Sequence, residues 1–148
     1  MLFAIMSDGP KPVWRLVKGQ QDICRFSYPQ SLRGRADFEM RLSSGERLKL
    51  IDKGFFKRRF EFWINGEKNV TLNNGLTRKY DPVNHIELKN RCVSLQGKAA
   101  WRYERGRFDW KGEGVYLQWQ VSESKHELLS IFMGIITFKS EFINSHAA

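Results

Sequence analysis

The sequence lacks most of the residue patterns that mark catalytic, metal-binding or nucleotide-binding proteins. Its three histidines are scattered and form no HExxH pattern, so they give little support to a metal site. The chain contains no Gly-rich phosphate loop of either standard pattern, and strands do not alternate with helices, which disfavours a dinucleotide-binding fold. We therefore find no catalytic constellation, and we expect a non-enzymatic protein with no cofactor and no metal.

Cysteine is also scarce, because Cys24 and Cys92 are the two in the chain and have no CxxC spacing. This predicts free or buried thiols in a reducing compartment and a cytoplasmic protein, with one disulfide as the open alternative. Cys92 with His85 could form a nucleophile and base, but the strand-like sequence RCVSL favours a core position for Cys92. Residues 1–12 have no basic start and too short an apolar run for a signal peptide. They are predicted to form a loose leader or a short first strand.

Bulky apolar residues are plentiful enough to form a core. Hydrophobic residues make up 41% of the 148 residues, and they include eleven Phe, five Trp and four Tyr. This composition is typical of a globular chain, and the length fits one domain over 13–148.

Most of the chain alternates apolar and polar residues with period two between Gly, Asn, Pro and Asp turns, which predicts antiparallel strands. Phe60, Phe62 and Ile64 precede Asn65 and Gly66, a pair typical of the tight turn of a hairpin. We count ten to twelve such strands, and this number favours a barrel or a sandwich. A pleckstrin-like sandwich is an alternative with fewer strands.

The period changes after Val121, and a helix is predicted over about 124–142. Its apolar part, residues 128–138, would be about 16 Å long, roughly half of a hydrocarbon layer, so it is too short to span a membrane. A helix that is apolar on every side must be enclosed. Six apolar side chains are expected to form this buried core helix. They are Leu128, Leu129, Phe132, Met133, Ile135 and Ile136.

The nine excess positive charges of the chain all lie in its middle. Residues 33–111 hold 19 Lys and Arg against 10 Asp and Glu, whereas the two ends together hold 6 of each. The candidate basic face comprises Arg47, Lys49, Lys53, Lys57, Arg58, Arg59, Arg78 and Lys79. Phe55 and Phe56 adjoin its densest part and are candidate membrane contacts, because aromatic and basic residues together suit an anionic lipid surface. The alternative is a solvated outer face that serves only solubility.

Three stretches resemble the tubby C-terminal-like superfamily, which includes tubby proteins, phospholipid scramblases and LURP-one-related proteins. They are Asp37–Trp63 with GFFKRRFEFW, Tyr103–Lys111 with YERGRFDWK, and HELLSIFMGIITFKSEF at the C-terminus. The resemblance covers about half of the chain. It implies a mainly β fold, with a closed antiparallel barrel of about twelve strands around the buried C-terminal helix.

The leading functional hypothesis is a tubby-like module, peripheral to a membrane, that binds anionic phospholipid such as phosphoinositide, or a protein partner, through its basic face. A nucleic-acid-binding domain is one alternative, because Trp101, Tyr103, Phe108 and Trp110 could stack on bases. These aromatics are spaced i and i+2, as core residues of a strand are. A carrier of small apolar ligands, with a lipocalin-like or START-like build, is the other alternative. A monomer is the default expectation.

Overall fold

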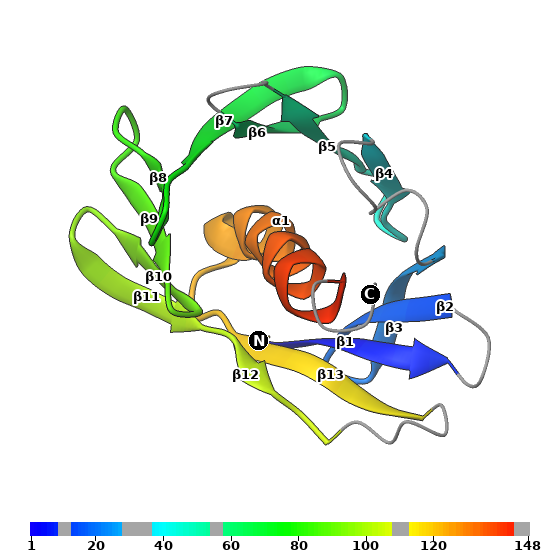
Figure 1. Ribbon diagram of the computed structural model, residues 1–148. Helices are drawn as coiled ribbons and strands as arrows, with labels where there is room; N and C mark the ends of the chain where they lie inside the picture. Colours follow the sequence, from blue (N-terminus) through cyan, green and yellow to red (C-terminus); the bar gives the residue numbers. More distant parts are fainter. Residues whose placement is uncertain (9–12, 28–36, 54–57, 108–112, 144–148) are drawn as a thin grey trace.

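The computed structural model describes residues 1–8, 13–27, 37–53, 58–107 and 113–143. In this part of the chain thirteen strands form two antiparallel sheets around one C-terminal helix (Figure 1). The five-stranded sheet has the order β12 (Glu104–Arg105), β13 (Glu113–Gln120), β1 (Leu2–Asp8), β2 (Val13–Lys18) and β3 (Gln21–Ser27). The eight-stranded sheet has the order β11 (Lys98–Arg102), β10 (Cys92–Leu95), β9 (Ile86–Lys89), β8 (Lys79–Asp81), β7 (Glu67–Asn74), β6 (Arg59–Ile64), β5 (Arg47–Lys53) and β4 (Phe38–Arg41).

The closed barrel predicted from the sequence is wrong, because both sheets are open. In the described residues β3 pairs only with β2 and β4 only with β5, while β11 and β12 pair with different neighbours. A backbone hydrogen bond from Ser43 N to Ile23 O, 2.8 Å long, joins the sheets just beyond β4. Alternation in a sequence reports which face of a strand a residue occupies, but not whether edge strands bond to each other. The prediction of closure therefore had no support from the alternation itself.

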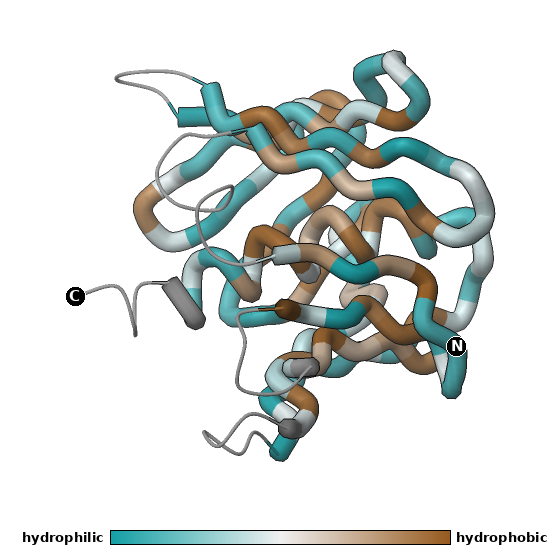
Figure 2. Tube along the Cα trace, turned by 90° about the vertical axis from the view of Figure 1, so that its right-hand side faces the viewer, coloured by the Kyte–Doolittle hydropathy of each residue, from teal (hydrophilic) through white to brown (hydrophobic). Residues whose placement is uncertain are grey.

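The eight-stranded sheet is a meander, in which each strand pairs with the next strand along the chain. The predicted hairpin at Asn65 and Gly66 is confirmed, since β6 pairs with β7 and both turn residues have positive φ, 51° and 84°. Hydrophobic and hydrophilic residues alternate along the strands (Figure 2). The apolar face of each sheet is therefore free to cover the helix.

The first strand lies within residues 1–12, the stretch that the sequence suggested as a leader or short strand. β1 is the middle strand of the five-stranded sheet, between β13 and β2. Phe3 and Ile5 are fully buried, whereas Ala4 and Met6 on the other face are half-buried. Because both faces carry apolar residues, the alternation of this strand is hidden in the sequence.

The C-terminal helix has three parts. A 3-10 turn, η2 (Ser124–His126), leads into α1 (Glu127–Phe138), and a π-helical turn, η3 (Lys139–Ile143), follows. Every residue from Ser130 to Phe138 is buried, including Phe132, Met133, Ile135 and Ile136. Leu128 and Leu129 are half-buried at the start of the helix. No helix in the described residues is long and apolar enough to cross a membrane.

Aromatic contacts attach α1 to both sheets. Phe132 stacks on Phe62 of the eight-stranded sheet, with ring centroids 4.5 Å apart. Phe138 meets Trp14 of the five-stranded sheet edge to face at 4.8 Å. Such pairs contribute beyond the area that they bury. The helix is thus the shared core of the two sheets.

Ser130 is the polar residue at the centre of this core. Its hydroxyl accepts a hydrogen bond from Trp119 Nε1 (2.9 Å) and donates one to Glu127 O. Its carbonyl accepts a hydrogen bond from the Tyr103 hydroxyl (2.6 Å). Buried polar groups are costly when they lack partners, so these bonds fix how the helix is rotated against β13.

We expect Phe132→Ala to lower the free energy of unfolding by about 3 to 5 kcal/mol, because it removes a buried ring and leaves a cavity. Urea denaturation followed by tryptophan fluorescence measures the change. The exposed Val83→Ala is the matched control and should change stability little. A loss below about 1 kcal/mol would contradict the enclosed position of the ring.

Gly134→Ala should also destabilise the protein, although alanine is the better helix former. A Cβ at Gly134 would lie 2.9 Å from Trp119 Cη2 and 3.2 Å from Tyr103 Cε1. Both rings are fully buried and hydrogen-bonded, so overpacking should cost about 1 to 3 kcal/mol. The melting temperature tests this, and an unchanged or higher value would contradict the close contact.

Candidate functional site

The meander places positive charge at one of its two ends. Successive turns of an antiparallel meander lie at alternate ends, so residues beside the turns after β5, β7 and β9 share one end with the end of β11. We call this end the basic end. Within two residues of these turns the described cations are Lys53, Arg58, Arg59, Arg78, Lys79, Lys89, Arg91, Arg102 and Arg105, and the acidic residues are Asp52 and Glu104.

The opposite end of the meander is balanced in charge. Within two residues of its turns, those after β4, β6, β8 and β10, lie Arg41, Arg47, Lys68 and Lys98 against Glu46, Glu67, Asp81 and Glu87. The excess positive charge of the eight-stranded sheet is therefore polarised along the strands. The C-terminal end of α1, the negative end of its dipole, lies at the basic end.

A pocket of about 460 Å³ opens at the basic end, between the β7–β8 turn, β9 and the C-terminal end of the helix. We call it the basic pocket. Its lining residues are Gly75, Leu76, Thr77, Arg78, Lys79, Leu88, Lys89, Asn90, Arg91, Arg102, Thr137, Ser140 and Glu141. Five of these side chains are cations and one is a carboxylate, so the pocket suits an anion.

Two of the five cations are paired. Arg78 Nη1 donates to Glu87 Oε2 at 2.6 Å and its guanidinium lies over the Tyr80 ring. Arg91 donates to Glu141, whose other oxygen lies 3.5 Å from Arg105 Nε. Glu141 thus attaches η3 to both sheets, because Arg91 adjoins β10 and Arg105 belongs to β12.

A second ion cluster lies beside the pocket, on β5. Asp52 is 6% exposed and faces the interior, where Arg58 Nη2 (2.5 Å) and Lys139 Nζ (3.4 Å) bind its carboxylate. Lys139 begins η3, so this cluster fixes the helix end to β5. A buried carboxylate is costly unless it is paired, and the two cations meet this need.

Lys79 has no such partner among the described residues. Its side chain is half-buried, and burial together with the nearby Arg58 guanidinium lowers the pKa of its ammonium group. No carboxylate of the described chain forms a salt bridge with it. Lys79 is therefore an uncompensated positive charge inside the basic pocket.

Arg91 adopts an unusual backbone conformation for its residue type. It follows Asn90 in the β9–β10 turn, and both have positive φ, 51° and 64°. Glycine is the usual residue at the second position of such a turn, and a left-handed conformation costs other residues on the order of 1 kcal/mol. This strained conformation places the Arg91 guanidinium at the edge of the pocket.

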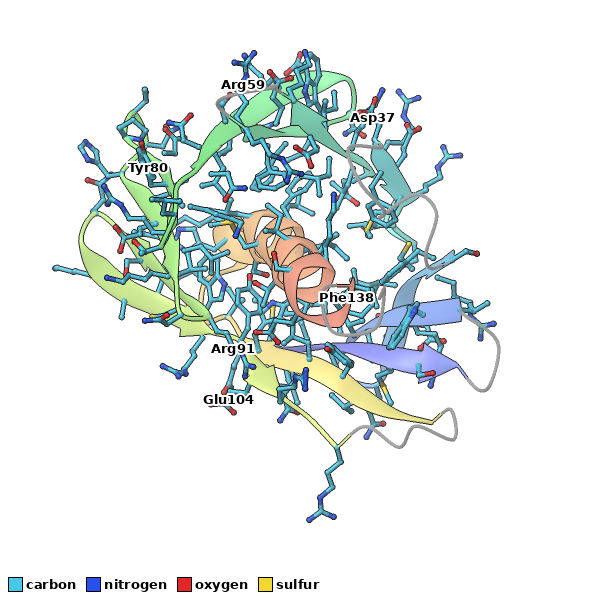
Figure 3. The ribbon with its side chains drawn as sticks, in the orientation of Figure 1. Asp37, Arg59, Tyr80, Arg91, Glu104 and Phe138 are labelled. Atoms are coloured by element: carbon cyan, nitrogen blue, oxygen red, sulfur yellow. The ribbon has the colours of Figure 1, made fainter. Side chains whose placement is uncertain are left out.

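The predicted basic face is divided between two places. Lys53, Arg58, Arg59, Arg78 and Lys79 flank the turns of the basic end, although Lys53 and Arg59 lie beside Glu61 and away from the pocket. Arg47 and Lys49 lie toward the other end of β5. Figure 3 shows Arg59 over β6, on the other side of the helix from Arg91. Lys57, Phe55 and Phe56 lie outside the described residues.

The cations on the outer face of β5 and β6 are largely neutralised. The buried Glu61 carboxylate lies 3.4 Å from Lys53 and 3.9 Å from Arg59, and it accepts a hydrogen bond from Trp63 Nε1. Lys49 lies 3.8 Å from Asp37. These pairs leave the outer face less suited to an anion than the basic pocket.

The prediction missed Lys89, Arg91 and Arg102, because it followed the density of charge along the sequence. In a meander, the turns after odd-numbered strands lie at one end of the sheet and the turns after even-numbered strands lie at the other. This rule places Lys89, Arg91 and Arg102 at the same end as Arg78 and Lys79. Glu141 and Lys139 could not be found in this way, since their position depends on how the helix crosses the sheets.

Of the aromatic residues proposed as a base-stacking surface, Trp101 and Tyr103 point inward. Trp101 is 5% exposed, Tyr103 is fully buried, and the two are hydrogen-bonded to each other. Phe108 and Trp110 lie outside the described residues. In the described ranges no cluster of three His, Cys, Asp or Glu could hold a metal ion.

No protein-family model, curated protein or solved structure matches the chain. The resemblance to the tubby superfamily therefore stays a prediction.

The uncompensated charge of Lys79 predicts that Lys79→Met raises the melting temperature at neutral pH. A lysine whose pKa is lower in the folded state than in the unfolded state destabilises the fold while it is protonated. This cost is present below the folded pKa and disappears once the pH exceeds the unfolded value of about 10.4. Thermal denaturation at pH 7 and at pH 11 tests the prediction, with the exposed Lys68→Met as control. A lower melting temperature at pH 7 would contradict it.

Proposed function

We propose that this protein is a non-enzymatic binding module that docks its basic end on an anionic phospholipid surface. The observation that carries the proposal is the polarised charge of the meander, nine described cations against Asp52 and Glu104 at one end and balance at the other. Each basic residue near an anionic membrane contributes about 1 kcal/mol, so such an end has a defined orientation toward the membrane.

The sequence of the β5–β6 connection supports this orientation. Phe55, Phe56 and Lys57 directly precede Arg58, one of the cations of the basic end. Aromatic residues favour the interface between lipid and water. The proposal assigns these two phenylalanines to the lipid side.

The interior gives no support to a carrier of apolar ligands. The apolar pocket beside α1, lined by residues such as Met40, Leu48 and Phe132, has a volume of only about 10 Å³. On this measure, a cavity needs about 10 to 15 Å³ to hold a single water molecule. The helix occupies the space that a ligand would need.

Vesicle sedimentation tests the proposal, with vesicles of phosphatidylcholine alone and of phosphatidylcholine mixed with phosphatidylserine. We expect binding only to the mixed vesicles, and a loss of roughly 30-fold for Lys89→Glu with Arg102→Glu. Both side chains are exposed and have no salt bridge in the described structure, so their reversal should leave the fold intact.

The matched control is Lys68→Glu with Lys98→Glu, which changes the net charge equally at the balanced end. Equal losses in both double variants would show attraction by net charge and would contradict an oriented basic end. Failure of the unmodified protein to sediment with mixed vesicles at low salt would remove the proposal.

A further inference from the structure

Three cations of the basic pocket have no negative partner in the described structure. They are Lys79, Lys89 and Arg102, whereas Arg78 pairs with Glu87 and Arg91 pairs with Glu141. A pocket of about 460 Å³ falls within the size range of ligand sites. Positive charge that a fold does not neutralise is available to a bound anion.

The number of free charges points to the kind of anion. A phosphodiester carries a single negative charge, whereas a phosphate monoester carries about −1.5 to −2 near pH 7 and presents three acceptor oxygens. The pocket offers three cations, and the Ser140 hydroxyl and Asn90 amide also line it. This donor set matches a monoester better than a diester.

We infer that the basic pocket binds a phosphate monoester group, through Lys79, Lys89 and Arg102. This inference rests on the proposed function, since it names the chemical group that the basic end recognises on an anionic surface. The same group occurs in soluble phosphate esters and in phosphatidic acid. Soluble phosphate esters and phosphatidic acid therefore present the same phosphate group to the pocket.

Lys79 is the selective element of this site. Lys89 and Arg102 are exposed, but Lys79 is half-buried next to Arg58. A bound anion therefore offsets both the desolvation cost of the Lys79 ammonium group and its repulsion from the Arg58 guanidinium. Bound phosphate would raise the pKa of Lys79 toward its ordinary value, and binding would then take up protons at alkaline pH.

Glu141 acts as an internal competitor. Its carboxylate lines the pocket and occupies Arg91, and it lies 3.5 Å from Arg105. It also repels an anion that enters the pocket. Removing its charge should therefore strengthen binding.

Isothermal titration calorimetry tests the inference with two soluble probes, glycerol 3-phosphate as the monoester and glycerophosphoglycerol as the diester. We expect binding of the monoester, at least tenfold tighter than the diester. In a second arm, vesicles containing phosphatidic acid are compared with vesicles containing phosphatidylglycerol, matched in total charge. Preference for the monoester in both arms supports recognition of the group itself, and preference in the vesicle arm alone supports recognition of the lipid headgroup.

Equal binding of monoester and diester in both arms would overturn the inference. The proposed membrane function would survive that result if phosphatidylserine vesicles still bound to the unmodified protein and not to Lys89→Glu with Arg102→Glu. The two proposals therefore fail independently.

Two variants should change the affinity for glycerol 3-phosphate in opposite directions. Lys79→Met should weaken it about tenfold or more, and Glu141→Gln should strengthen it severalfold. The control Lys68→Met, at the balanced end, should leave it unchanged. Loss of affinity in Glu141→Gln with an unchanged melting temperature, or full affinity in Lys79→Met, would contradict the assignment of these residues.

Discussion

The burial of α1 on every side is the constraint on which the rest of the structure depends. Nine consecutive residues from Ser130 to Phe138 are buried, so apolar surface must meet the helix from all directions. Neither sheet covers the helix alone. The two sheets share one core, and the hydrogen bonds to Ser130 set the rotation of the helix within it.

The enclosed helix also explains why the charged groups gather at its C-terminal end. An apolar core excludes ionised side chains unless they are paired, and the chain must become polar again where α1 ends. Lys139 and Glu141 meet this need by pairing with Asp52, Arg91 and Arg105. The helix end is thus held by ion pairs to β5, to the β9–β10 turn and to β12. The basic pocket lies among these attachments.

The sequence indicated which face of a strand a residue occupies and which segments form strands or the helix, but not how the edge strands pair. Its alternation correctly indicated the hairpin at Asn65 and Gly66, and its change of period indicated the helix. It could not show that β11 and β12 pair in different sheets, because hydrogen bonding between edge strands leaves no periodic signal. The candidate site was found in part, since Arg78 and Lys79 were named and Lys89, Arg91 and Arg102 were not. Every second turn of a meander lies at the same end of the sheet, so residues that are far apart in the sequence can meet there. The density of charge along the sequence does not show which turns share an end.

The position of β1 has a consequence for the order of folding. Strands β4 to β11 pair with their sequence neighbours, so their turns can form locally and early. The five-stranded sheet is different, because β1 pairs with β13, where Leu2 faces Gln120. This pairing closes a loop that contains the whole meander, and the loss of chain entropy makes such long-range closure slow. We therefore expect the apolar face of the meander to stay uncovered until the last strand and the helix pack on it, and the chain to be most prone to aggregation in this interval.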